Sequence, residues 1–201
     1  MIIFLETRLV CLSGKNDRVR PSRVGYTLRD FLAITLLATL GMVTKHLLQP
    51  LSRSLLSAFF IPGGVFFGGL YMMWLALARG MVAKPGSATL AAFVQAGVNL
   101  LLGLSPIHGV LSLFVYLLPG IFIDLVFLLP GQATLSRLAR FTLACLGANV
   151  IGIVSVALVW GIGQRPLILL AAVGALSGAV GGLMAFFICE KMPSRALHTS
   201  V

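Results

Sequence analysis

The chain has 201 residues, of which 59% are hydrophobic and only 10% are charged, and its mean hydropathy is +1.05. This composition excludes an ordinary soluble domain and is typical of a polytopic helical membrane protein. The net charge of +10 does not indicate nucleic-acid binding, because the basic residues flank apolar runs instead of forming one basic face.

The first 29 residues are expected to form a basic cytoplasmic tail. Met1–Leu12 is apolar but is broken by Glu6 and Arg8 and is too short to span a bilayer. It has no basic region followed by a small-residue cleavage site, so we do not expect a signal peptide. The stretch from Lys15 to Asp30 is polar and basic.

Six apolar segments follow this tail, and they predict an all-α integral membrane protein built as a six-transmembrane-helix bundle over residues 30–190. The segments are Phe31–Leu48, Ile61–Val82, Gly86–Gly103, Gly109–Leu129, Leu138–Ile162 and Pro166–Cys189. At roughly 20 residues per span, the chain has room for these helices and short turns, but for no separate soluble domain. Residues 191–201 are expected to be a second cytoplasmic tail. Pro119 lies inside the fourth segment and is expected to kink it.

The basic residues predict the orientation of the bundle. With both termini in the cytoplasm, 12 of the 15 basic residues lie on the inner side, and only Lys45, Arg53 and Arg165 lie outside. The positive-inside rule therefore favours a multi-pass protein of the cell membrane with both ends cytoplasmic.

Glycines recur every four residues in two of the segments. Gly174, Gly178 and Gly182 form such a stripe in the sixth segment, and Gly64 with Gly68 forms a shorter one in the second. Small residues at this spacing let helix backbones approach closely in lipid, so we expect these stripes to be packing surfaces.

Polar side chains at membrane depth are the candidates for substrate contact. Gln95 and Asn99 are four residues apart and therefore lie on one helix face. The full set of expected substrate-binding residues is Tyr71, Trp74, Gln95, Asn99, His108, Tyr116 and Asn149. Buried amides also serve simply as hydrogen-bonding links between helices, and that alternative stays open for each of them. His108 is as well explained as a helix cap, and Tyr116 as a core residue.

Two ionisable residues lie nearer the ends of their segments. Lys45, beside His46 near the outer end of the first segment, is expected to extend its ammonium to the membrane surface. Asp124 lies near the inner end of the fourth segment, where Arg137, Arg140 or Arg79 would pair with it. We therefore expect Asp124 to be structural or to dock a partner, and not to bind substrate.

Motifs for catalysis, metals and ATP are missing from the sequence. Gly14-Lys15 is not part of a phosphate-binding loop, because Leu9 stands at the glycine position and Asn16 replaces the Ser or Thr. Ser177 has no histidine within a helix to activate it. The three cysteines form neither a CxxC motif nor a Cys/His cluster. We expect no enzyme activity, no cofactor and no metal site.

A family resemblance rests on residues 60–130. The residues that carry it are Gly69-Leu70-Tyr71, Lys84-Pro85-Gly86-Ser87-Ala88, Leu101-Leu102-Gly103 and Asp124-Leu125-Val126-Phe127. This pattern resembles the substrate-binding S components of energy-coupling-factor (ECF) vitamin transporters, in particular the thiamine/hydroxymethylpyrimidine (YkoE-like) group. The resemblance implies a six-helix protein that binds one small vitamin or precursor from outside. It would then dock on a transmembrane coupling subunit driven by two ATPase subunits.

The resemblance also implies roles for single residues. Tyr71 matches a tryptophan that lines the site in the family pattern, whereas Asn99 and Ala92 replace acidic residues of the pattern. Loss of these acids removes the natural counter-charge of the thiamine cation. The substrate expected is therefore a neutral heteroaromatic, such as hydroxymethylpyrimidine or a benzimidazole-like precursor, with thiamine less favoured.

Partner docking in this family uses small residues of the first helix, which here are Ala33, Thr35, Ala38 and Thr39. The connection Gln49–Phe60, which leads to Ile61-Pro62-Gly63-Gly64, would serve as an outer lid. Two alternatives remain open: a stand-alone secondary carrier, and a membrane scaffold without a ligand.

Overall fold

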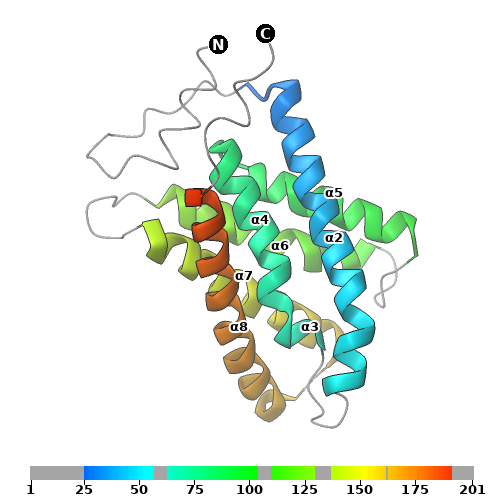
Figure 1. Cartoon of the computed structure of the whole chain (residues 1–201). Coiled ribbons are helices and arrows are strands. Elements are labelled where there is room, and N and C mark those ends of the chain that lie inside the picture. Colours follow the sequence, from blue (N-terminus) through cyan, green and yellow to red (C-terminus); the bar gives the residue numbers. More distant parts are fainter. Residues whose placement is uncertain (1–24, 57–62, 104–109, 130–136, 162, 192–201) are drawn as a thin grey trace.

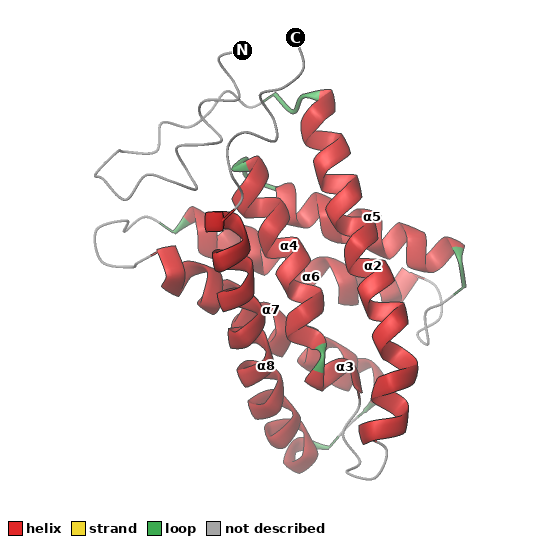
Figure 2. Ribbon diagram, in the orientation of Figure 1, coloured by secondary structure: helices red, strands yellow, loops and turns green. Residues whose placement is uncertain are grey.

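The computed structural model describes residues 25–56, 63–103, 110–129, 137–161 and 163–191, and all regular structure in these ranges is helical (Figures 1 and 2). The helices are α2 (Leu28–Leu56), α3 (Gly63–Phe66), α4 (Gly68–Val82), α5 (Ser87–Leu101), α6 (Val110–Leu128), α7 (Arg137–Trp160) and α8 (Gln164–Lys191). The prediction of an all-α fold is thus confirmed. The domain limits predicted at residues 29 and 191 border on tails that lie almost wholly outside the described residues.

Three of the described helices are long and apolar enough to cross a membrane: α2, α7 and α8. The helices α4, α5 and α6 have 15, 15 and 19 residues. The structure therefore supports a multi-pass membrane protein. That exactly six helices span the membrane stays a prediction. Large apolar side chains such as Leu36, Phe114 and Leu176 are exposed on the outer surfaces of the bundle, as lipid contact requires.

The first and second predicted segments differ from the helices observed. Helix α2 continues to Leu56, so Gln49–Leu56 of the expected lid is helical; the rest of that lid, residues 57–60, lies outside the described residues. The second segment is divided into α3 and α4 at Phe67, whose φ and ψ of −90° and 1° interrupt the helix. Helix α6 runs on through Pro119, which is fully buried.

Glycines bring α8 close to two neighbouring helices. A Cβ atom on Gly178 would lie 2.7 Å from the Cys145 carbonyl oxygen of α7, and one on Gly181 would overlap the backbone of Gly69 in α4. The stripe predicted in α8 is therefore confirmed as a packing surface, and Gly181 belongs to it as well. In the shorter predicted stripe, Gly68 lies against Asn149, whereas no atom of the described residues lies within 4 Å of a Cβ added to Gly64.

Helices α5 and α6 form an antiparallel pair that crosses behind α2 and α4 in Figure 1. Gly120 of α6 lies against α5, where an added Cβ would be 2.6 Å from Ala92 Cβ and 2.9 Å from the Ala88 carbonyl oxygen. Gln95 of α5 connects this pair to α2, because its Nε2 donates to the Ala38 carbonyl oxygen over 3.3 Å. The described helices thus pack around α4, and α6 also packs against α7, where a Cβ on Gly147 would overlap the Phe122 ring.

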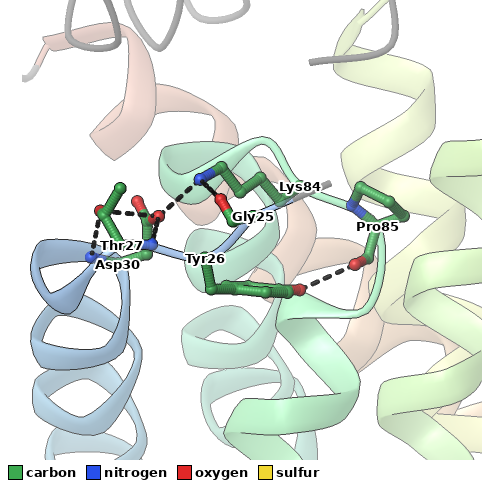
Figure 3. Close-up of polar contacts among 6 residues, drawn as sticks. All are labelled: Gly25, Tyr26, Thr27, Asp30, Lys84 and Pro85. Carbon is green, nitrogen blue, oxygen red and sulfur yellow. Dashed lines mark hydrogen bonds and ion pairs between the residues drawn. The ribbon is translucent and has the colours of Figure 1, made fainter. Parts of the chain in front are cut away.

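A polar connection joins the start of α2 to the turn between α4 and α5, and we call this end of the bundle the turn end (Figure 3). Lys84 Nζ lies 2.6 Å from both Asp30 Oδ2 and the Gly25 carbonyl oxygen. The Tyr26 hydroxyl donates to the Pro85 carbonyl oxygen over 2.7 Å. Burial, with the nearby Asp124 carboxylate, raises the pKa of Tyr26, so this phenol keeps the proton that it donates.

The turn end also has a capped helix start. Thr27 and Asp30 form reciprocal hydrogen bonds, with the Thr27 N–H donating to Asp30 Oδ2 over 2.7 Å and the Asp30 N–H donating to Thr27 Oγ1 over 3.4 Å. This pattern satisfies backbone donors that the first helical turn leaves open. Gly86 has φ 89°, a left-handed conformation that glycine adopts readily, and it ends the turn before α5.

The close approach of α8 and α4 predicts that Gly181→Ala lowers stability by about 1–3 kcal/mol, the usual cost of overpacking. Its methyl group would overlap the Gly69 backbone. The measurement is the thermal unfolding midpoint of the purified protein in detergent.

Gly97→Ala is the matched control, because Gly97 lies in α5 with no atom within 4 Å of an added Cβ. Alanine favours a helix over glycine, so this control is expected to be neutral or slightly stabilising. Equal losses in the two variants would contradict the close contact.

The turn-end connection predicts that Lys84→Gln lowers stability by about 1–3 kcal/mol, since hydrogen bonds to charged groups contribute on this scale. A double-mutant cycle with Asp30→Asn, followed by thermal unfolding, measures the coupling between the two side chains. Lys191→Gln, an exposed change at the end of α8, is the control. Additive effects of Lys84→Gln and Asp30→Asn would show that the ion pair contributes nothing.

Candidate functional site

One stripe of α2 faces α4 and α5. It contains Ala38, Gly41 and Lys45, which follow each other at spacings of three and four residues. Because Gly41 has no side chain, Gln95 Nε2 and the Trp74 side chain both reach its Cα: an added Cβ would lie 3.2 Å from Trp74 Cβ and would overlap Gln95 Nε2. Gln95 and Trp74 therefore meet at Gly41, in the interior of the bundle.

A second set of polar side chains lies one helical turn further from the turn end. Asn99 Nδ2 donates to the Tyr116 hydroxyl over 2.7 Å, and Lys45 Nζ donates to the same oxygen. The ammonium also lies 4.4 Å from the centroid of the Tyr116 ring. We call Lys45, Trp74, Gln95, Asn99 and Tyr116 the polar cluster. It joins α2, α4, α5 and α6.

Several buried atoms at or beside the polar cluster have no hydrogen-bond partner among the described residues. They are Asn99 Oδ1, Trp74 Nε1 and, next to Lys45 in the chain, His46 Nε2. Asn99 is fully buried, and Gln95 is only 6% exposed. Buried polar atoms are nearly always paired in proteins, and an unpaired one costs about 1–3 kcal/mol. An open donor and an open acceptor in one cluster suit a ligand that supplies both.

The structure brings four of the seven expected site residues into this cluster: Trp74, Gln95, Asn99 and Tyr116. Tyr71 is half-buried one turn of α4 nearer α3, and no hydrogen bond joins it to the cluster. His108 lies outside the described residues. Whether any of them binds substrate stays a prediction.

Asn149 lies elsewhere, at the junction of α4, α7 and α8. Its Nδ2 donates to the Gly174 carbonyl oxygen over 2.7 Å, and its side chain lies against Gly68. This geometry matches the alternative that the sequence left open, in which a buried amide links helices. Asn149 therefore lies apart from the polar cluster, and its expected contact with substrate stays a prediction.

Lys45 is the residue of the cluster that the sequence reasoning missed. The expectation that its ammonium reaches the membrane surface is wrong, because the side chain turns inward to Tyr116. The reason is its place on α2, on the same stripe as Ala38 and Gly41. That spacing was visible in the sequence, but only the packing of α2 showed which face is internal.

The expected docking face on α2 is also divided. Thr35 and Thr39 are exposed, whereas Ala38 is 1% exposed and Ala33 packs against the core. Ala38 therefore contacts α5 and is covered within the chain. Of the four predicted docking residues, only the two threonines point away from the bundle.

Asp124 has the structural role that its position predicted. Arg79 Nε lies 3.2 Å from Asp124 Oδ1, which selects Arg79 among the three proposed partners. The carboxylate also accepts hydrogen bonds from the Thr89 N–H at 2.8 Å and the Thr89 hydroxyl at 2.7 Å. It thereby caps the start of α5 at the turn end, far from the polar cluster.

The donor set of the polar cluster differs from that of a metal site. Its side chains are an ammonium, two amides, a phenol and an indole, and none of them is a carboxylate or a thiolate. Among the described residues, no three His, Cys, Asp or Glu side chains gather as metal ligands would.

Comparisons with known proteins agree with this architecture. A family model, described as the permease component of an ABC-type cobalt transport system, matches residues 29–151. A solved structure described as "Crystal structure of an S-component of ECF transporter" is 21% identical, with a TM-score of 0.68. That match covers 83% of this chain and 85% of the other. None of the curated proteins matches the chain.

The family model covers more than half of the residues, and the structural likeness extends over most of both chains. The chain therefore belongs to the family of permease components of ABC-type cobalt transport systems, and it has the fold of an ECF S-component.

Proposed function

We propose that this chain is the membrane-embedded substrate-binding subunit, or S component, of an ECF-type importer. The family and the fold support this class of protein. The observation that carries the proposal is the polar cluster, in which Trp74 Nε1 and Asn99 Oδ1 are buried without partners. A small molecule with an acceptor and a donor would satisfy both.

The substrate that we propose is a small, flat heteroaromatic compound of the hydroxymethylpyrimidine or benzimidazole kind. Aromatic rings of Trp74 and Tyr116 suit a flat ring, and the Asn99 amide suits a ring nitrogen or its substituent. The Lys45 ammonium in the same cluster repels cations. Thiamine, which carries a positive charge, is therefore less suited, and so is a bare cobalt ion.

The partners follow from the proposed class. The chain would dock on a transmembrane coupling subunit that is driven by two ATPase subunits, with both termini in the cytoplasm. The turn end would then face the cytoplasm, where Arg79, Lys84, Arg137 and Lys191 satisfy the positive-inside rule. The exposed side of α2 that includes Thr35 and Thr39 would be available to the coupling subunit.

A stand-alone secondary carrier is the second candidate function. The described residues provide little support for it, because they lack an unpaired buried acid that could bind a coupling ion. Such carriers commonly bind their coupling ion at buried acids. The buried acid of the described helices is Asp124, and it is already paired with Arg79 and Thr89. This pairing favours an importer that takes its energy from separate ATPases.

Asn99→Ala is expected to weaken binding of the native ligand about 10-fold, because it removes one hydrogen bond of roughly 1.4 kcal/mol. Native mass spectrometry of the purified chain, released from detergent, measures the small molecule that it retains. Thr142→Ala is the control, since that hydroxyl bonds only within α7, to the Leu138 carbonyl oxygen.

Equal retention by Asn99→Ala and wild type would remove Asn99 from the site. A wild-type chain that retains no small molecule, even after candidates are added, would instead support the membrane scaffold.

The lone chain in proteoliposomes is expected to bind ligand without accumulating it, even when a proton gradient is imposed. Accumulation should require the coupling subunit, both ATPases and ATP. The measurement is uptake of the ligand identified by mass spectrometry, with protein-free liposomes as control. Gradient-driven accumulation by the lone chain would establish the secondary carrier.

A further inference from the structure

Lys45 brings a positive charge into the interior of the bundle. Its side chain is partly buried and donates to the Tyr116 hydroxyl, whose ring lies 4.4 Å from the ammonium. Tyr116 Oη already accepts from Asn99 Nδ2, so the phenol oxygen receives two donors. An ammonium has three N–H groups, and this neutral oxygen pairs with one of them.

No carboxylate of the described residues balances this charge. The sequence contains five acidic residues, of which Asp30, Asp124 and Glu190 lie in the described ranges. Asp30 pairs with Lys84, and Asp124 pairs with Arg79. Asp30 is 15 residues from Lys45 along α2, a distance of about 22 Å. Glu190 lies at the end of α8, which is also part of the turn end.

An ammonium between membrane helices is costly unless it is paired. The Tyr116 hydroxyl and ring compensate it in part, through one hydrogen bond and the cation–π contact. Trp74, which meets α2 at Gly41, one helical turn from Lys45, presents a buried indole N–H without an acceptor among the described residues. The Lys45 ammonium and the Trp74 indole N–H are both hydrogen-bond donors, so each would pair with an oxygen or nitrogen acceptor. An anionic oxygen suits the ammonium best.

We infer that Lys45 is the counter-charge for an anionic group of the substrate, so that the ligand is a heteroaromatic compound bearing an acidic substituent such as a carboxylate. This inference rests on the proposed function and narrows it. The ring lies with Trp74 and Asn99, and the acidic group lies at Lys45 and Tyr116. Within the proposed class of flat heteroaromatic compounds, an acidic substituent takes the place of the neutral one that the sequence favoured, because Lys45 lies inside the bundle and not at the membrane surface.

The test uses a small-molecule extract of the cells that naturally make the chain, divided on an anion exchanger into acidic and non-acidic fractions. The purified full chain is incubated with each fraction, and native mass spectrometry records the bound mass. Three proteins are compared: wild type, Lys45→Gln and Lys45→Arg. Thermal unfolding in detergent verifies that the variants are folded.

Wild type is expected to take its ligand from the acidic fraction. Lys45→Gln is expected to bind that compound about 10- to 100-fold more weakly, because it loses a charge-assisted hydrogen bond. Lys45→Arg should retain more of the binding than Lys45→Gln, since it keeps the charge. A merely structural Lys45 would change the unfolding midpoint and leave the choice of fraction unchanged.

Two results would overturn the inference and leave the proposed function intact: a ligand taken only from the non-acidic fraction, or equal binding of the acidic compound by wild type and Lys45→Gln. A phospholipid as the bound acidic compound would also overturn it, because Lys45 would then be a lipid contact. If neither fraction yields a bound compound, the proposed function itself fails together with the inference.

Discussion

Polar groups between membrane helices have no water to pair with, and this constraint distinguishes the two ends of the bundle. At the turn end the charges are paired, since Asp124 binds Arg79 and Thr89 and Lys84 binds Asp30, while Ser87 Oγ is buried there without a hydrogen-bond partner among the described residues. At the polar cluster, Asn99 Oδ1 and Trp74 Nε1 are buried without partners. The first arrangement holds helices together, while the second leaves hydrogen-bonding capacity for another molecule.

Glycines permit close contacts on both sides of α4. Close packing through Gly178 and Gly181 ties α8 to α7 and α4, so this group of helices has little room between its backbones. On the other side of α4, Gly41 of α2 leaves room for the Gln95 and Trp74 side chains, and Gln95 donates to the Ala38 carbonyl oxygen. Polar side chains lie on both sides of α4, because Asn149 and Ser177 form hydrogen bonds within the glycine-packed group as well.

The substrate site that we propose at the polar cluster would also limit the chemistry of its ligand. An ammonium at Lys45 disfavours cations, and the aromatic rings of Trp74 and Tyr116 favour a flat compound. The family description names cobalt, yet the side chains of the cluster are unlike the ligand sets that hold transition metals. Specificity within a shared fold thus depends on a few side chains, and not on the arrangement of helices.

Composition and hydrophobic runs were sufficient to predict an all-α membrane fold, the Arg79–Asp124 pairing as one of three options, and packing through Gly178. These properties depend on local sequence, because apolar length and residue size act wherever a helix lies in a bilayer. The break at Phe67, the inward direction of Lys45 and the removal of Asn149 from the cluster depended on packing. Each requires knowing which face of a helix meets which neighbour. Helical spacing identifies residues that share a face, but only contacts between distant segments decide whether that face meets lipid, another helix or a ligand.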